Sequence, residues 1–143
     1  MLKGVPPAIS PELMYTLMKM GHGDELVLAD GNFPADSIAQ RIVRADGLGV
    51  PNVLEAIAGF YPLDGYVDAA AFVMQPVPGD DPEPPIWKQF SQLLEASEGK
   101  PVELKQVERF AFYEQAKEAY AVVATSETAI YANLILKKGV VLL

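Results

Sequence analysis

Short apolar runs alternate along this chain with segments in which apolar residues recur at helical spacing. Residues 25–29 and 69–74 are brief, nearly continuous apolar runs, which are typical of buried strands. Ile86, Phe90 and Leu94 recur every four positions, as on the buried face of an amphipathic helix. A chain that alternates strands with helices in this way is expected to fold as an α/β sheet covered on both faces.

The ends of the expected helices are also marked. Ser10 is a good N-cap residue, Pro11 suits the first helical position, and Gly21 suits the C-terminal end. Gly99 ends the helix that starts near Ile86 in the same way. We also expect helices over residues 51–57 and 110–119, and strands over residues 102–107, 121–124, 134–136 and 140–143.

Residues 76–85 interrupt this pattern with five prolines, three acidic residues and a glycine. Proline fixes φ and lacks a backbone N–H, so such a stretch forms neither a helix nor a strand. We expect an exposed loop, and the ordinary role of such a loop is to connect two elements across the surface.

At 143 residues the chain is expected to form one domain, residues 1–143, and its 50% hydrophobic content supports a self-sufficient core. The absence of cysteine excludes disulfides, thiolate metal sites and cysteine nucleophiles. A single histidine excludes a multi-histidine metal cluster within one chain, and no calcium-binding loop of spaced acidic residues occurs. Sites for hard cations built from carboxylates alone are left open by these counts.

The charge balance bears on the expected partners. The formal net charge is −8 and no cluster of lysine and arginine occurs, which argues against binding to nucleic acid or to an anionic membrane surface. No apolar run approaches membrane-spanning length, and the first residues form no apolar signal core. These features lead us to expect a cytoplasmic protein.

His22 is the first candidate for chemistry, since the phosphate-binding, dinucleotide-binding and nucleophile-elbow motifs are all absent. It lies between Gly21 and Gly23, which allow a sharp turn and an accessible imidazole. The preceding helix end and Asp24 both favour its charged form, which suits a general acid. The alternative is a loop histidine that only caps the carbonyl groups of that helix.

Further polar residues stand where a ligand pocket is expected. Asp30 follows an apolar strand, and open α/β sheets bind ligands beyond the carboxyl ends of their strands, although a turn aspartate is the alternative. Arg109, Tyr113 and Tyr120 lie around one expected helix and suit a polyhydroxylated ligand, but a solvated arginine and half-buried tyrosines are as common. Asn133 supplies both a donor and an acceptor, as a sugar hydroxyl requires.

Blocks of sequence in order along the chain carry a more specific signal. They are residues 1–4 (MLKG), 9–13 (ISPEL), 20–25 (MGHGDE), 29–30 (AD), 32–35 (NFPA), 44–47 (RADG), 109–114 (RFAFYE) and 131–140 (YANLILKKGV). Together they resemble the L-fucose mutarotase / D-ribose pyranase family over nearly the whole chain, with residues 64–102 matching least. The block at 109–114 looks like the fucose branch, while Ala132 stands where some fucose-type relatives have glycine.

The resemblance implies a fold, an assembly and an activity. The fold is an RbsD-like three-layer α/β sandwich with a mixed central β-sheet, and the expected assembly is a homo-oligomer, ring-like in some members. The activity is that of an isomerase that exchanges the anomers of fucose or a related monosaccharide without metal or cofactor. The family's proton-donating histidine falls on His22, and its sugar-contacting positions fall on Asp30, Arg109 and the segment Tyr131, Ala132 and Asn133.

Mutarotation opens the hemiacetal ring and recloses it on the other face of the carbonyl. One acid and one base suffice, each typically contributing about 10²–10⁴-fold. His22 is the expected acid, and the base is left open between Asp30, a tyrosine and bound water. Two alternatives stand beside this hypothesis: a non-catalytic monosaccharide-binding protein linked to sugar uptake or regulation, and a ribose-type pyranase. The true sugar, the oligomer size and any contribution of a neighbouring subunit to the site are also left open.

Overall fold

The centre of the computed structural model, which describes residues 1–143, is a six-stranded sheet in the order β2-β5-β1-β6-β3-β4. Its strands are β1 (Glu25–Ala29), β2 (Ile42–Ala45), β3 (Ala71–Met74), β4 (Lys105–Val107), β5 (Ala121–Thr125) and β6 (Leu134–Lys137). Five strands run in one direction, and β6 runs antiparallel to its neighbours β1 and β3. The expected mixed central sheet is confirmed.

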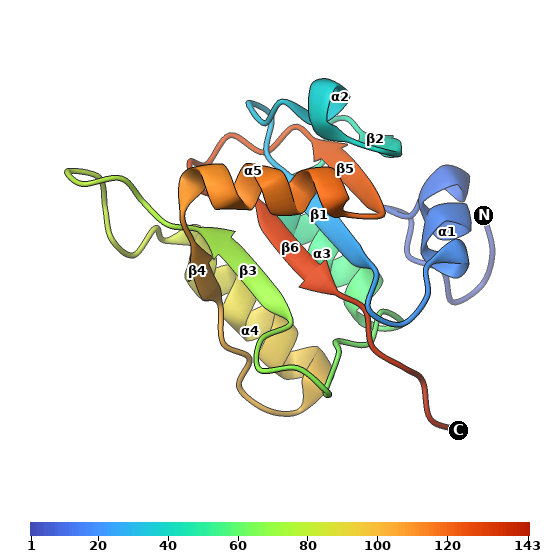
Figure 1. The fold of residues 1–143 in the computed structure, drawn as a ribbon. Coiled ribbons are helices and arrows are strands. Elements are labelled where there is room, and N and C mark those ends of the chain that lie inside the picture. The colour runs from blue at the N-terminus through green and yellow to red at the C-terminus, as the bar shows by residue number, and fades with distance from the viewer.

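Helices cover both faces of this sheet. One hydrophobic core lies between the sheet and α1 (Pro11–Lys19), α3 (Val50–Ala58) and α4 (Ile86–Glu98), and a smaller core lies under α2 (Ala35–Ile38) and α5 (Arg109–Glu118). Figure 1 shows α5 crossing one face of the sheet, with α3 and α4 behind it. The protein is therefore the three-layer α/β sandwich that the sequence predicts.

The apolar runs follow from this layering. Successive side chains of a strand point to opposite faces of a sheet. Leu26 and Leu28 of β1 accordingly belong to the larger core, whereas Val27 and Ala29 belong to the smaller one. Because both faces are covered, neither set of side chains can be polar, and the strand is apolar throughout.

The expected helix-end signals at Ser10 and Gly99 are confirmed, whereas the expected stop at Gly21 is not. The Ser10 hydroxyl accepts a hydrogen bond from the Leu13 backbone N–H at 3.1 Å, which caps α1. Gly99 follows α4 with a φ of 75°, the left-handed conformation that glycine adopts at helix C-termini. Helix α1 itself ends at Lys19, two residues before Gly21.

The structure differs from these expectations in three respects. Residues 140–143 were expected to pair as a strand, but they form no regular structure, because β6 already has a neighbour on each side and the tail leads away from the sheet (Figure 1). Strand β2 and the short helix α2 were not predicted, since only Val43 of β2 and Ala35 of α2 are buried. Strands β3 and β4 start at Ala71 and Lys105, later than expected.

No helix combines the length and the apolar character needed to cross a membrane.

Candidate active site

Two predicted site residues meet at one end of the sheet. Asp30 directly follows β1, and Asn133 directly precedes β6, which pairs antiparallel with β1. The backbone N–H of Asp30 donates a hydrogen bond to Oδ1 of Asn133 at 2.8 Å. The sheet topology thus joins residues that lie 103 positions apart in the sequence.

These residues border an open hollow of about 240 Å³. Its walls are formed by Asp30, Asn32, Phe33, Met74, Asp80, Tyr113, Ile130, Tyr131 and Asn133. Pockets for drug-sized ligands measure about 300–1,000 Å³, so this hollow suits a smaller molecule. Carboxylate and amide groups beside aromatic and aliphatic side chains match a molecule that carries hydroxyl groups and also a C–H surface.

Asp30 is the buried carboxylate of this hollow, with 8% of its surface exposed. Burial raises the pKa of Asp30, because it disfavours the charged form, while hydrogen bonds from Asn32, Phe33 and Asn133 oppose this effect. The Asn32 backbone N–H donates to Oδ1 of Asp30 at 3.0 Å and fixes the orientation of the carboxylate. A buried carboxylate with a raised pKa is a better proton acceptor than an exposed one, which suits a general base.

The start of α5 places the cation of Arg109 beside Tyr113, although Arg109 itself does not line the hollow. Glu108 caps this helix by accepting hydrogen bonds from the backbone N–H groups of Phe110 and Ala111. Arg109 is exposed, forms no ion pair, and its guanidinium lies 5.9 Å from the ring centroid of Tyr113. Tyr113 in turn lies 5.7 Å from the ring centroid of Phe33. The donor groups of Arg109 are therefore free for a ligand.

Tyr131 and Ala132 differ in the atoms that each exposes to a ligand. The Tyr131 side chain lines the hollow, and its backbone has a φ of 54°. Ala132 is fully buried in the larger core, so its methyl group is not available to a ligand. Any contact that Ala132 makes with a ligand must come from its backbone.

His22 lies at the opposite end of the sheet from Asp30. The five residues of β1 separate them, a distance of about 17 Å along the strand. Nε2 of His22 lies 3.1 Å from Oδ1 of Asp64, and the His22 side chain is 45% exposed. The imidazole thus pairs with a carboxylate instead of capping α1.

Asp64 is buried beneath His22 and accepts a further hydrogen bond from the Tyr66 backbone N–H at 3.0 Å. These contacts, the Tyr66 bond first and His22 after it, lower the pKa of Asp64. Tyr120 also lies at this end, since it precedes β5 and its N–H donates to the Glu25 carbonyl. Within one chain the predicted site therefore divides into two groups at opposite ends of the sheet.

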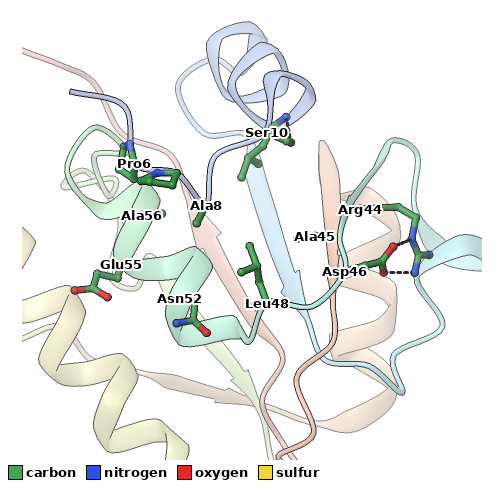
Figure 2. A pocket seen from close by; sticks show the side chains of 12 residues that line it. Pro6, Ala8, Ser10, Arg44, Ala45, Asp46, Leu48, Asn52, Glu55 and Ala56 are labelled. Atoms are coloured by element: carbon green, nitrogen blue, oxygen red, sulfur yellow. Dashed lines mark hydrogen bonds and ion pairs between the residues drawn. The ribbon is translucent and has the colours of Figure 1, made fainter. Parts of the chain in front are cut away.

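A larger hollow, of about 890 Å³, lies between residues 6–13, residues 44–48 and helix α3. Figure 2 shows that two of its charged residues, Arg44 and Asp46, point at each other, and their closest atoms are 2.6 Å apart. None of the predicted site residues lines it. Because it lacks the predicted polar residues, we assign the candidate site to the smaller hollow.

Comparison with known proteins supplies the family. Residues 3–141 match the model of the RbsD / FucU transport protein family. The chain belongs to this family. It is 54% identical to fucose mutarotase of Homo sapiens over 99% of this chain and 96% of that protein. It is 51% identical to L-fucose mutarotase of Actinobacillus pleuropneumoniae, over 98% of this chain and 97% of that protein.

Solved structures of RbsD / FucU proteins agree. Fucose mutarotase from Streptococcus pneumoniae, solved in complex with L-fucose, is 48% identical and superposes with a TM-score of 0.93, covering 99% of this chain and 100% of that chain. Bacillus subtilis RbsD, solved with D-ribose, is 22% identical with a TM-score of 0.73 and covers 99% of this chain and 100% of that chain. At that identity the second similarity shows the fold alone.

Several residues around the hollow of this RbsD / FucU protein were not predicted. Asn32 and Phe33 follow Asp30 directly, so the strand end before them was a usable signal. The separation of His22 from Asp30 was also readable, because an intervening strand must place its two flanks at opposite ends. Asp80 carried no such signal, since it lies in the proline-rich loop and reaches the hollow only through tertiary contacts.

Proposed function

We propose that this protein is a fucose mutarotase, an isomerase that interconverts the α and β anomers of L-fucose or a closely related monosaccharide. The observation that carries the proposal is the polar hollow around Asp30 and Asn133, in a chain that superposes with a TM-score of 0.93 on a fucose mutarotase solved with L-fucose. Relatives named fucose mutarotase match over nearly their whole length. The size and polarity of the hollow fit a monosaccharide.

Asp30 is the proposed general base. It takes the proton of the anomeric hydroxyl, the oxygen forms a carbonyl bond to the anomeric carbon, and the bond from that carbon to the ring oxygen breaks. An acid protonates the ring oxygen at the same time. Rotation and reclosure on the other carbonyl face return both protons, so neither group is consumed. Arg109 and Asn133 supply hydrogen bonds to sugar hydroxyls, and Tyr113 supplies a flat surface for the C–H groups.

His22 is the proposed acid, and we infer that a neighbouring subunit of a homo-oligomer delivers it. Three observations support this inference: His22 lies far from Asp30 in its own chain, its side chain is half exposed, and Nε2 is paired with Asp64. That pairing leaves Nδ1 as the nitrogen that faces the substrate. Tyr120 lies at the same end of the sheet, so a contact from Tyr120 to the sugar also requires a neighbouring subunit.

The exposed apolar tail supports a homo-oligomer, and a closed ring is the arrangement we propose. Val140, Val141, Leu142 and Leu143 are all exposed in the single chain. Contiguous apolar surface of this kind marks an interface between proteins, and an interface repeated around a rotation axis closes into a ring. Such an assembly brings the His22 end of one subunit to the Asp30 end of the next.

NMR magnetisation exchange between the anomers of L-fucose tests the proposed function. The protein is expected to speed the α/β exchange above the buffer rate, and EDTA is expected to leave that rate unchanged. Sugar binding with exchange at the buffer rate would instead indicate the non-catalytic monosaccharide-binding protein. Faster exchange of D-ribose than of L-fucose would indicate a ribose-type pyranase.

A further inference from the structure

Tyr131 is the only residue other than glycine with a positive φ. A side chain crowds the backbone in this conformation, so it persists only where surrounding contacts hold it. Three contacts do so. The Trp87 indole N–H donates to the Tyr131 carbonyl at 2.9 Å, the Tyr131 hydroxyl donates to Oδ2 of Asp80 at 2.6 Å, and the Val77 backbone N–H donates to that hydroxyl at 3.1 Å.

All three partners lie between the end of β3 and the first turn of α4. Val77 and Asp80 belong to the proline-rich segment 76–85, and Trp87 lies in the first turn of α4. Figure 1 shows this segment as a yellow-green loop that projects beyond β3. Most of the loop is exposed, as expected. The expectation that it only connects two elements is incomplete, because the loop also forms hydrogen bonds with Tyr131 of the candidate site.

We propose that Asp80 is a positioning residue of the mutarotase reaction, which holds Tyr131 and thereby sets the segment from Tyr131 to Asn133 that faces the sugar. The inference rests on the proposed function. Asn133 lies two residues beyond Tyr131 and accepts the hydrogen bond from the backbone N–H of Asp30. A shift of Tyr131 therefore displaces both Asn133 and the proposed base.

The same contacts define what Tyr131 does not do. Its hydroxyl group already donates to Asp80 and accepts from Val77, so the proton of the phenol has a fixed partner. The hydrogen bond to Asp80 is the main reason that the pKa of Tyr131 is raised, with a backbone hydrogen bond from Val77 opposing it. Tyr131 is thus held as a wall of the hollow, and the proton transfers are left to other groups.

A double-mutant cycle tests the proposal. Asp80→Ala and Tyr131→Phe each remove the same hydrogen bond, and each is expected to lower kcat/KM for L-fucose exchange about 10-fold, since small misplacements of binding groups slow catalysis strongly. The double variant is expected to be no slower than either single variant, and Asp80→Asn, which keeps an acceptor, is expected to recover most of the activity. Asp81→Ala is the matched control, because Asp81 is the next residue and the one hydrogen bond of its side chain is accepted from the Glu83 backbone N–H.

Two kinetic outcomes overturn the proposal. Wild-type exchange by Asp80→Ala would show that the hydrogen bond positions nothing. Losses that multiply in the double variant would show that Asp80 and Tyr131 act separately, with Asp80 touching the sugar directly.

The single tryptophan provides a readout that needs no sugar. The Trp87 indole N–H gives one resonance, and its hydrogen bond to Tyr131 is expected to protect it from solvent exchange. Asp80→Ala is expected to speed that exchange, while Asp81→Ala leaves it unchanged. An unchanged indole in Asp80→Ala overturns the proposal. If the wild-type protein fails to speed anomer exchange while the indole responds as expected, the proposed function fails and the contact between Asp80 and Tyr131 stands.

Discussion

Asp30 and Asp64 are both buried aspartates, yet their surroundings shift their pKa values in opposite directions. Burial raises the pKa of Asp30, whereas hydrogen bonds from Tyr66 and His22 lower that of Asp64. A raised pKa means that the folded state disfavours the ionised carboxylate, and a lowered pKa means that it favours it. Near neutral pH the ionised carboxylate of Asp30 therefore destabilises the fold, although its raised pKa makes it a stronger base. The ionised carboxylate of Asp64 stabilises the fold.

Isosteric variants test these signs. At pH 7, Asp30→Asn is expected to raise the melting temperature while slowing anomer exchange about 100-fold. Asp64→Asn is expected to lower the melting temperature. The fold is stabilised only by the protonated form of Asp30. That contribution to the free energy of unfolding is present below the unfolded pKa of Asp30 and is lost as pH rises through its folded pKa. The contribution of Asp64 is present above its unfolded pKa and is lost as pH falls through the folded value.

Melting curves from pH 7 down to pH 3 check this prediction. Both differences from the wild type are expected to shrink toward the acid end, as protonation begins to remove the charge on each aspartate. Asp68→Asn serves as the control, because Asp68 is exposed and forms no hydrogen bond through its side chain. Equal melting temperatures for the two variants at pH 7 would contradict the assignment of opposite shifts.

At the scale of elements, the loop between β5 and β6 ties the site to helix α3. Oε2 of Glu127 accepts a hydrogen bond from the backbone N–H of Val50, the first residue of α3. Its Oε1 accepts from the backbone N–H groups of Thr128 and Ala129, in the loop that leads to Tyr131. One carboxylate thus caps a helix from outside and shapes the loop at the edge of the hollow.

Replacement of this carboxylate is expected to affect both stability and activity. Glu127→Ala should lower the free energy of unfolding by about 1–2 kcal/mol, the usual effect of removing a helix cap. It should also lower kcat/KM, because the loop that carries Tyr131 loses two of its hydrogen bonds. Urea melts and anomer exchange on the same variant measure the two effects. Glu95→Ala, an exposed glutamate of α4 without a side-chain partner, should change neither.

At the scale of the whole molecule, one chain places the predicted site residues in two separate groups. Asp30, Asn133, Tyr131 and Arg109 gather at one end of the sheet, and His22 lies at the other. A strand between two residues prevents them from acting on one small ligand. Under the proposed function, assembly is therefore a requirement of catalysis and not only of stability.

Subunit mixing tests this requirement. His22→Ala and Asp30→Asn are each expected to be nearly inactive as homo-oligomers, with rates at least about 100-fold down. Refolded together in equal amounts, they are expected to regain about a quarter of the wild-type activity, since random assembly pairs an intact Asp30 end with an intact His22 end at that frequency. Light scattering checks that the mixture assembles. An assembled but inactive mixture would show that His22 does not act across subunits.

The elements that were predicted correctly are those whose causes are local. The cap at Ser10, the helical spacing from Ile86 and the stop at Gly99 depend on contacts within about four residues, so the sequence alone determined them. The apolar runs of β1 and β6 likewise follow from burial on both faces. Asp30 and Asn133 were identifiable because each stands directly beside one of these apolar strands.

Tertiary structure decided what depends on distant partners. The edge strand β2 has a single buried residue, so only its pairing with β5 makes it a strand. Asp80 meets Tyr131 across 51 positions, and no local pattern marks a proline-rich loop as the holder of a site residue. The antiparallel insertion of β6 between β1 and β3 brings Asn133 to Asp30. Interactions between residues close in the sequence thus determined most helices and strands of this protein. Packing between distant segments determined which ends of these elements lie together.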